Sequence, residues 1–467
     1  MTRRGTGTPS TREIAVQRAR TRCAFRAWLL SGLAAHGAVF AAVAEATAPG
    51  EEQPPTPEAW AVHGQITNVT QGHPTFRAPY SGQNSLRPDG RTEETTDATL
   101  FLGVRVWNGG ELWLNPELDQ GRGLDDTVGV AGFPSGEAYK IGSNTPYVRL
   151  PRAFLRHTVD LGGDSRPVAA AANQLAAVRT ADTLTITIGK FGVTDIFDTN
   201  SYAHDPRGDF LNWSIIDTGT FDYAADAWGF TYGGAAEWSQ GSRTLRGGVF
   251  QLSREPNGKI TAVDFSEFML VAELEQRYRI NGASGKVKLL GFLNRGRMAA
   301  YRDAVEQGTA QGTTPDVAAV RRNASRAGFA LNIEHAFGDE VGAFVRAGVN
   351  DGSKEAYEFT EINRTLAAGV SIQGRAWGRS EDTVGIAGVA NALSNDARGY
   401  FAAGGLGILI GDGRLNYGAE RIVELYYAFR PNAHIAFTLD YQHVGNPAYN
   451  RDRGPVSVYG FRAHAEF

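Results

Sequence analysis

The chain has little cysteine, little lysine and almost no long hydrophobic run. Of its 467 residues one is cysteine, and lysine supplies six of the 46 basic residues. A membrane-spanning helix needs about 20 apolar residues, and only residues 27–44 approach that length. The sequence therefore excludes a membrane protein built from several helices. It also excludes a disordered chain, because 42% hydrophobic and 10% aromatic residues can bury a core or cover an apolar surface.

Glycine and aromatic residues are plentiful. The chain contains 57 glycines together with 24 Phe, 16 Tyr and 8 Trp. Glycine disfavours helices, and aromatic side chains favour the pleated surface of a sheet. The composition therefore indicates a β protein. Its mean hydropathy of −0.28, averaged over all residues, resembles that of a large soluble one.

The amino terminus has the pattern of an export signal. Seven arginines precede the apolar run of residues 27–44, which ends in Ala44-Glu45-Ala46. A basic region, an apolar region and a small-residue cleavage pattern define a secretory signal peptide. We therefore predict a signal peptide over residues 1–46 and a short flexible leader over residues 47–59. The alternative is an amino-terminal membrane anchor, for which the apolar run is short.

Cleavage at this point changes the charge of the chain. It removes seven basic and two acidic groups together with Cys23, and leaves 39 basic and 48 acidic residues, a net charge of −9. An exported chain without cysteine avoids oxidative cross-linking. The negative charge gives no reason to expect a nucleic-acid partner.

Between Trp60 and Phe467 apolar and polar residues alternate along about sixteen segments, which is typical of β-strands with two different faces. In the last segment Tyr459, Phe461 and Phe467 share one face, and Arg462 and Glu466 lie on the other. A soluble sandwich or propeller also alternates, but no repeat of the length of a propeller blade appears.

The predicted joints between segments alternate in length. Even-numbered joints are tight, as at residues 108–110 and 378–380, whereas odd-numbered joints are long, as at residues 192–225. Short turns at one end and long loops at the other are typical of an all-β, up-and-down antiparallel outer-membrane barrel, with the short turns periplasmic and the long loops extracellular. About 16 strands leave an aqueous lumen. The fourth joint, residues 161–181, is too long for this pattern, so either the strand count slips there or the joint carries a helix.

Several motifs in this order resemble the OprB-type carbohydrate-selective porins of Gram-negative bacteria. The stretches are residues 81–86 (SGQNSL), 99–103 (TLFLG), 111–117 (ELWLNPE), 121–124 (GRGL), 129–137 (GVAGFPSGE), 189–206 (GKFGVTDIFDTNSYAHDP), 210–213 (FLNW) and 446–455 (NPAYNRDRGP). The likeness spans residues 60–467. It implies a channel for passive diffusion of sugars across the outer membrane, with no cofactor, surrounded by lipid and lipopolysaccharide. It also implies that the barrel-assembly machinery reads the last strand, which ends in Phe467, and it leaves a monomer and a homo-oligomer both open.

A sugar presents hydroxyl groups and flat C–H faces, so a selective pore needs charged or amide groups and aromatic rings on the lumen side. Strand parity predicts such a set on the lumen face of three neighbouring segments. The predicted contacts are Arg105, Trp107, Glu111, Trp113, Asn115, Glu117, Arg152, Phe154 and Arg156. Arginine and glutamate together offer donors and acceptors with little net field, which suits a neutral solute. The alternative is that these residues are ordinary lumen charges that satisfy one another.

Two long loops are candidates for narrowing the pore. The predicted constriction residues are Arg122, Glu137 and Lys140 in one loop and Asp195, Asn200, Asn212 and Trp213 in the other. The oxygen-bearing residues Asp195, Asp198, Asn200 and Asp205 could hold a calcium ion. Their spacing differs from that of an EF-hand, so a loop closed by hydrogen bonds is the competing interpretation.

No motif for hydrolytic or nucleotide chemistry occurs in the sequence, which contains no G-x-S-x-G, H-E-x-x-H, Walker A or paired C-x-x-C pattern. We therefore predict a passive porin for mono- and disaccharides rather than an enzyme. A pore without sugar selectivity, and a barrel that serves as an enzyme or adhesin, are the alternatives.

Overall fold

The structure is a computed structural model that describes residues 56–138 and 142–467. The predicted signal peptide, most of the predicted leader and Lys140 lie outside the described residues.

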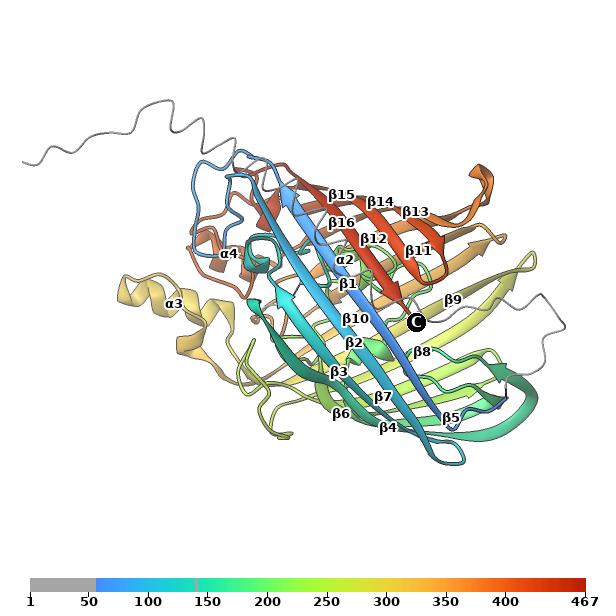
Figure 1. Cartoon of the computed structure of the whole chain (residues 1–467). Helices are drawn as coiled ribbons and strands as arrows, with labels where there is room; N and C mark the ends of the chain where they lie inside the picture. Colours follow the sequence, from blue (N-terminus) through green and yellow to red (C-terminus); the bar gives the residue numbers. More distant parts are fainter. Residues whose placement is uncertain (1–55, 139–141) are drawn as a thin grey trace, which may run out of the picture. The chain divides into compact units, whose positions relative to one another are not determined.

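Sixteen strands in these two ranges form one closed antiparallel barrel (Figure 1). The strands are β1 (Trp60–His73), β2 (Arg91–Trp107), β3 (Gly110–Gly121), β4 (Ser143–Val168), β5 (Ala177–Phe191), β6 (Thr231–Gln240), β7 (Arg243–Gln251), β8 (Phe268–Ile280), β9 (Ala283–Met298), β10 (Arg322–Phe337), β11 (Val341–Asn350), β12 (Arg364–Gly374), β13 (Arg379–Ala392), β14 (Glu420–Asn432), β15 (Ile435–Gly445) and β16 (Val456–Glu466). Each strand pairs with its neighbours in sequence, and β1 pairs with β16. Closure leaves no open edge, so the predicted fold and strand count are confirmed.

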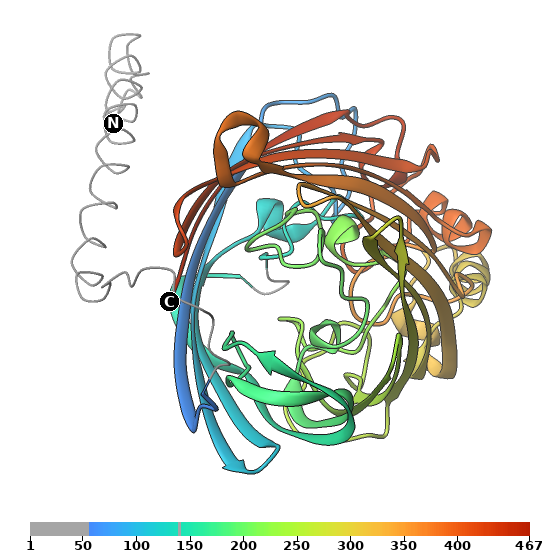
Figure 2. The ribbon, with the colours of Figure 1, turned by 90° about the vertical axis from the view of Figure 1, so that its right-hand side faces the viewer.

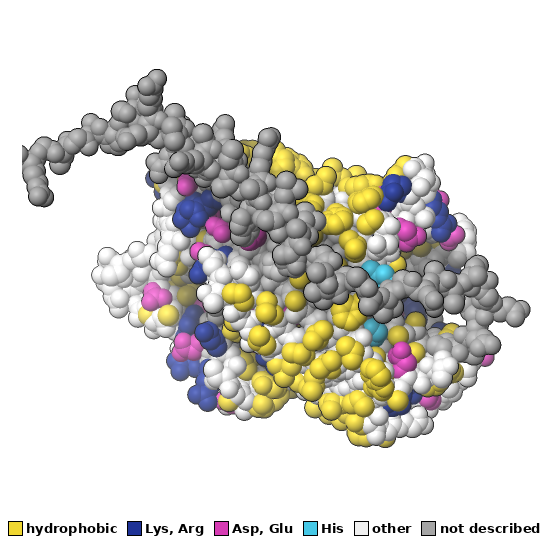
Figure 3. Space-filling model, in the orientation of Figure 1, with side chains coloured by type: hydrophobic (Ala, Val, Ile, Leu, Met, Phe, Trp, Pro, Cys, Tyr) yellow, Lys and Arg dark blue, Asp and Glu magenta, His cyan; other side chains and the backbone are white. Residues whose placement is uncertain are grey.

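Alternation along the strands separates an apolar outer wall from a polar lumen. In β16, Val456 and Val458 are buried on the lumen side, whereas Tyr459 and Phe461 are exposed on the outside. Figure 3 shows hydrophobic side chains gathered over the middle of the wall, with charged side chains toward both ends. This is the pattern expected of strands that meet lipid on one face and water or loops on the other.

The joints confirm the predicted alternation of short turns and long loops. The odd-numbered joints carry all the helical turns of the described residues except η4 (Arg375–Trp377). These are η1 (Leu124–Thr127), η2 (Val193–Asp195), α2 (Trp213–Ile216), α3 (Tyr301–Gln311), η3 (Ala318–Val320), α4 (Asn395–Ala402) and η5 (Pro447–Tyr449). Within the described ranges, none of the helices has the length and apolar character needed to cross a membrane.

Both explanations offered for the fourth joint are wrong, because the strand count does not slip and the joint carries no helix. β4 and β5 continue past their neighbours and leave a turn of residues 169–176. Their pairing shifts register twice, between Asp160 and Gly162 and between Gly162 and Ser165. Such bulges interrupt the strict alternation of apolar and polar residues, so the alternating pattern does not predict the ends of the two strands.

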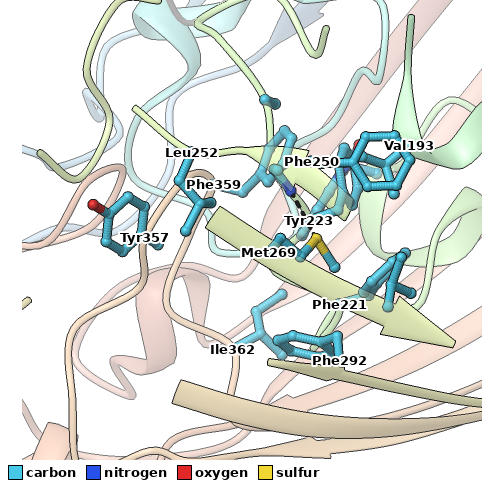
Figure 4. Packing of buried hydrophobic residues seen from close by; sticks show 14 of the residues in the cluster. Val193, Phe221, Tyr223, Phe250, Leu252, Met269, Phe292, Tyr357, Phe359 and Ile362 are labelled. Carbon is cyan, nitrogen blue, oxygen red and sulfur yellow. Dashed lines mark hydrogen bonds between the residues drawn. The ribbon is translucent and has the colours of Figure 1, made fainter. Parts of the chain in front are cut away.

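Several loops fold into the lumen of the barrel (Figure 2). The close view in Figure 4 shows side chains of the β5–β6 loop against the barrel wall. Phe221 of this loop lies 5.4 Å from Phe292 of β9 between ring centroids, and the backbone N–H of Ala224 donates to the sulfur of Met269 at 3.2 Å. Buried aromatic packing of this kind fixes the loop inside the barrel rather than above it.

Candidate functional site

The β5–β6 loop, residues 192–230, crosses the lumen and is anchored on strands β11 to β16. Arg346 of β11 is fully buried and donates to two carbonyl oxygens of the loop, both at 2.7 Å. Glu424 of β14 accepts two backbone N–H groups of the loop at 2.5 and 3.1 Å. Arg462 of β16 donates to three loop carbonyls at 2.5, 2.8 and 3.1 Å. Buried charges on this wall are therefore used to hold the backbone of the loop.

The β3–β4 loop packs against the β5–β6 loop. Glu420 of β14 accepts two of its backbone N–H groups at 3.0 and 2.7 Å. Phe133 of the β3–β4 loop stacks on Trp213 of the other loop, with ring centroids 5.0 Å apart and an interplanar angle of 13°. The side-chain amide of Asn212 donates to the carbonyl oxygen of Gly132 at 2.8 Å. The two loops thus form one packed body across the lumen.

On the opposite side, the loop body meets strands β2 to β5 through ion pairs that keep part of their surface. Arg152 of β4 donates to both carboxylate oxygens of Asp195, at 2.7 and 2.8 Å. The Arg152 side chain is 16% exposed and that of Asp195 is 30% exposed. Arg207 of the loop body pairs with Asp97 of β2 at 3.5 Å. It also pairs with Glu137 at 3.1 Å and with Asp205 at 3.8 Å within the loops, and the Asp205 side chain is 56% exposed.

Two arginines of β4 share an aromatic partner at this place. The guanidinium carbon of Arg152 lies 4.7 Å from the ring centroid of Phe230, and that of Arg149 lies 5.1 Å from it. Arg149 also binds the carboxylates of Glu117 and Asp119. The planar forks are thereby held in fixed orientations. The side chain of His204 in the β5–β6 loop is 27% exposed, and its Nδ1 lies 3.9 Å from a carboxylate oxygen of Asp217. We refer to Arg149, Arg152, Asp195, His204, Asp205 and Arg207 as the eyelet group.

The pKa values of carboxyl groups in the loops are shifted in opposite directions by their surroundings. Burial opposes ionisation of Asp195, but the adjacent Arg152 outweighs it and lowers its pKa. Burial and the neighbouring Asp198 raise the pKa of Asp217 to about 7. Burial likewise raises the pKa of Glu361, in the β11–β12 loop, to about 7. Asp195 therefore stays charged at neutral pH, whereas Asp217 and Glu361 are partly protonated.

The predicted contacts on β3 and β4 come together on the lumen face but are covered. Glu111, Trp113, Asn115, Glu117 and Phe154 are all buried. Trp113 donates to Glu111 at 3.1 Å and lies flat on Gly103, where an added Cβ atom would come within 2.4 Å of the indole ring. These five side chains keep almost no exposed surface, so they form part of the packed wall. Of the predicted β4 residues, Arg152 belongs to the eyelet group.

The prediction that Trp107 shares the lumen face is wrong. A bulge between Arg105 and Trp107 reverses the parity of the strand end and places Trp107 opposite Gly110. Its side chain is 49% exposed, and its indole N–H donates to His157 on the outer face of β4 at 3.1 Å. A half-exposed tryptophan near the end of an outward-facing apolar strand fits the membrane–water boundary.

Arg105 and Arg156 hold the β4–β5 turn inside the lumen. Arg105 donates to the carbonyl oxygen of Ala176 at 3.1 Å, and Arg156 donates to that of Asn173 at 2.7 Å. Leu175 of the same turn is fully buried. These contacts attach a segment from the short-turn end to the lumen face of β2 and β4, a role that strand parity did not suggest.

The predicted loop residues fall into three groups. Glu137, Asn200, Asn212 and Trp213 are buried within the loop body or between it and the wall. Arg122 pairs with Asp126 at 2.6 Å on the exposed part of the β3–β4 loop. Asp195 belongs to the eyelet group, and Lys140 lies outside the described residues.

The carboxylates considered for calcium have separate partners. Asp195 binds Arg152, and Asp198 accepts from the backbone N–H of Thr218 at 2.6 Å. The side-chain amide of Asn200 donates to Asn332 at 2.7 Å. Throughout residues 56–138 and 142–467, no group of three or more His, Cys, Asp or Glu side chains is arranged to hold a metal ion.

Arg149, Arg207 and Phe230 were missed as site residues. The parity of β4 places Arg149 outside, but the register shift between Asn115 and Glu117 brings it opposite Glu117 on the lumen side. Pro151 lies at this shift and is the available signal, since proline inside a sheet marks an edge or a bulge. Arg207 and Phe230 sit in a loop whose path no periodic pattern describes.

Comparison with solved structures agrees with this architecture. The high-pH structure of OprB from Pseudomonas putida matches with a TM-score of 0.67 and 14% identity, covering 88% of this chain and 94% of that chain. The outer-membrane channel DcaP of Acinetobacter baumannii matches with a TM-score of 0.50 and 10% identity, covering 87% and 97%. At these identities the matches show the fold alone. A search of curated proteins finds no match.

The family model described as carbohydrate-selective porin, OprB family, matches residues 83–467. The match covers all of the eyelet group and both loops of the packed body. It agrees with the resemblance carried by the sequence motifs and with the closed sixteen-strand barrel. The chain belongs to the OprB family of carbohydrate-selective porins, which places it in the outer membrane of a Gram-negative bacterium as a passive channel for carbohydrates.

Proposed function

We propose that this porin selects mono- and disaccharides at the eyelet group. The observation that carries the proposal is the bidentate Arg152–Asp195 pair, which stays partly exposed where the loop body meets β4. A guanidinium beside a carboxylate offers donors and acceptors to sugar hydroxyls while adding little net field. Solute would enter between the long loops, pass the eyelet group and leave at the short-turn end. The proposal includes no cofactor, no metal ion and no energy source.

We also infer that Phe467 serves as the assembly signal and that lipid and lipopolysaccharide cover the apolar wall. Phe467 is exposed, and its backbone N–H and carbonyl pair with Gly64 of β1 at 2.9 and 3.1 Å. A terminal aromatic on the closing strand is accessible until β1 and β16 meet. That position suits recognition during assembly.

The test of selectivity uses the purified protein in liposomes. We expect swelling with glucose and with a disaccharide to exceed swelling with amino acids of similar size. Equal rates for all solutes would reduce the protein to a general porin. We also expect sugars to reduce the single-channel current in a saturable manner. If sugars do not reduce the current, a barrel with an enzymatic or adhesive role is favoured.

A further inference from the structure

A cavity of about 700 Å³ lies between the inward-folded β4–β5 turn and the wall of β5. Its lining includes Asn173 and Arg166 from the turn region and Thr185 from β5, and it reaches Asp195 and His204 of the eyelet group. In Figure 2 the end of the β4–β5 hairpin leans from the wall toward the inside of the barrel. We refer to this space as the exit cavity, because it lies between the eyelet group and the short-turn end. A solute that has passed the eyelet group enters it next.

One wall of the exit cavity is a row of hydroxyl groups. Thr183, Thr185 and Thr187 alternate along β5, so all three face the lumen and together span about 13 Å. The hydroxyl of Thr185 lies 3.2 Å from that of Thr158 on β4. The hydroxyl oxygen of Thr187 and the side-chain oxygen of Asn173 are buried without a hydrogen-bond partner among the described residues. Thr183 and Thr185 are half-buried, so their hydroxyl groups can meet a polyhydroxylated solute, whereas the Thr187 hydroxyl is buried behind the row.

The charges of the exit cavity do not cancel. Its carboxylates already have arginine partners, as Asp195 pairs with Arg152, Glu237 with Arg246 and Glu111 with Arg105. Two arginines of the lining have no carboxylate within ion-pair distance in the described part of the chain. These are Arg156, which stacks on Phe154 at 5.1 Å, and Arg166, which is exposed. Unpaired guanidinium groups favour an anionic solute.

We propose that the exit cavity is a second solute site, selective for sugar acids, which carry both hydroxyl groups and a carboxylate. Arg156 and Arg166 together attract the carboxylate, and the hydroxyls lie along the threonine row of β5. This inference rests on the proposed function, since it concerns solutes that the eyelet group has admitted. It assigns the β4–β5 turn a role in selectivity at the exit.

The experiment measures ion current through single channels in a planar bilayer, with D-gluconate added at the short-turn side. We expect gluconate to interrupt the current in a saturable manner, whereas acetate, which lacks hydroxyls, and glucose, which lacks charge, bind about tenfold more weakly or not at all. Arg166→Gln should weaken gluconate binding about tenfold, and Arg166→Glu should abolish it. Arg166 is exposed near the end of β4, so both variants are expected to fold.

The matched control is Arg254→Glu, which makes the same charge reversal in the long β7–β8 loop at the opposite end. It should leave gluconate binding unchanged. The exit site would be overturned if gluconate blocked the current of the wild type and of Arg166→Glu equally. It would also be overturned if gluconate did not block the wild-type current at all. If wild-type liposomes still admit glucose, the proposed function survives that result. Failure to admit glucose would instead overturn the proposed function.

Discussion

The two sides of the lumen use charged residues in different ways. On the β11–β16 side, Arg346, Glu424 and Arg462 are buried and hold the backbone of the loop body. On the β2–β5 side, Arg152 and Asp195 bind each other and keep exposed surface. The sequence pattern is the same on both sides, with charged residues alternating against apolar ones. What differs is whether a loop covers them, so Arg346, Glu424 and Arg462 anchor a loop, whereas Arg152 and Asp195 keep exposed surface in the lumen.

Removing an anchor should have the largest effect. Arg346→Ala leaves two loop carbonyls and Asp198 without their buried partner, which costs about 3 kcal/mol or more. We expect the β5–β6 loop to lose protection from hydrogen exchange and the ion conductance to rise several-fold. Arg346→Lys, which keeps the charge, is the control and should retain part of the protection. Unchanged conductance in Arg346→Ala would mean that the loop body does not narrow the pore.

Removing an eyelet residue should have a smaller effect, confined to selectivity. Asp195→Ala breaks a partly exposed pair worth about 1 kcal/mol, so the ratio of glucose to amino-acid uptake should fall about fivefold. The barrel should keep its thermal stability, measured as the temperature of the gel-mobility shift. Arg254→Ala, an exposed pair partner in an outer loop, is the control for removing a surface ion pair. A selectivity ratio equal to that of the wild type would remove Asp195 from the solute path.

The smallest expected effect is a pH dependence of the stability of the loop body. The pKa of Asp217 is raised to about 7, so its protonated form favours the packed loop. This contribution is fully present below about pH 4 and is lost as the pH rises through about 7. The protection factors of residues 192–230, which are intrinsic exchange rates divided by the observed rates at the same pH, should therefore show more protection at pH 5 than at pH 8. Asp217→Asn cannot ionise and should remove most of the difference; a difference of the same size in the variant would assign it to another group.

Most of the fold followed from local pattern. Alternating faces, tight even joints and long odd joints predicted a sixteen-strand barrel, because lipid and water impose opposite demands on neighbouring residues. The pattern failed at bulges, where an extra residue changes which side chains face inward. One bulge turned Trp107 outward, another brought Arg149 inward, and two more lengthened the β4–β5 hairpin.

The candidate site was predicted less completely. Parity placed Arg152 and Glu117 on the lumen side, and the long loops were correctly expected to fold inward. The sequence could not tell that Glu117 is buried under Arg149 while Arg152 keeps exposed surface. Arg105 and Arg156 were predicted to face the lumen, which they do, but their attachment to the β4–β5 turn depends on how that turn folds back.

By itself the sequence determined that the chain is a barrel with an apolar outside, a polar inside and loops long enough to enter it. Those properties depend on neighbours along the strand, which the sequence lists directly. Only the tertiary structure decided which lumen charges stay exposed. That choice depends on where loops from distant parts of the chain cross the lumen, and on the few bulges that reverse a strand's two faces.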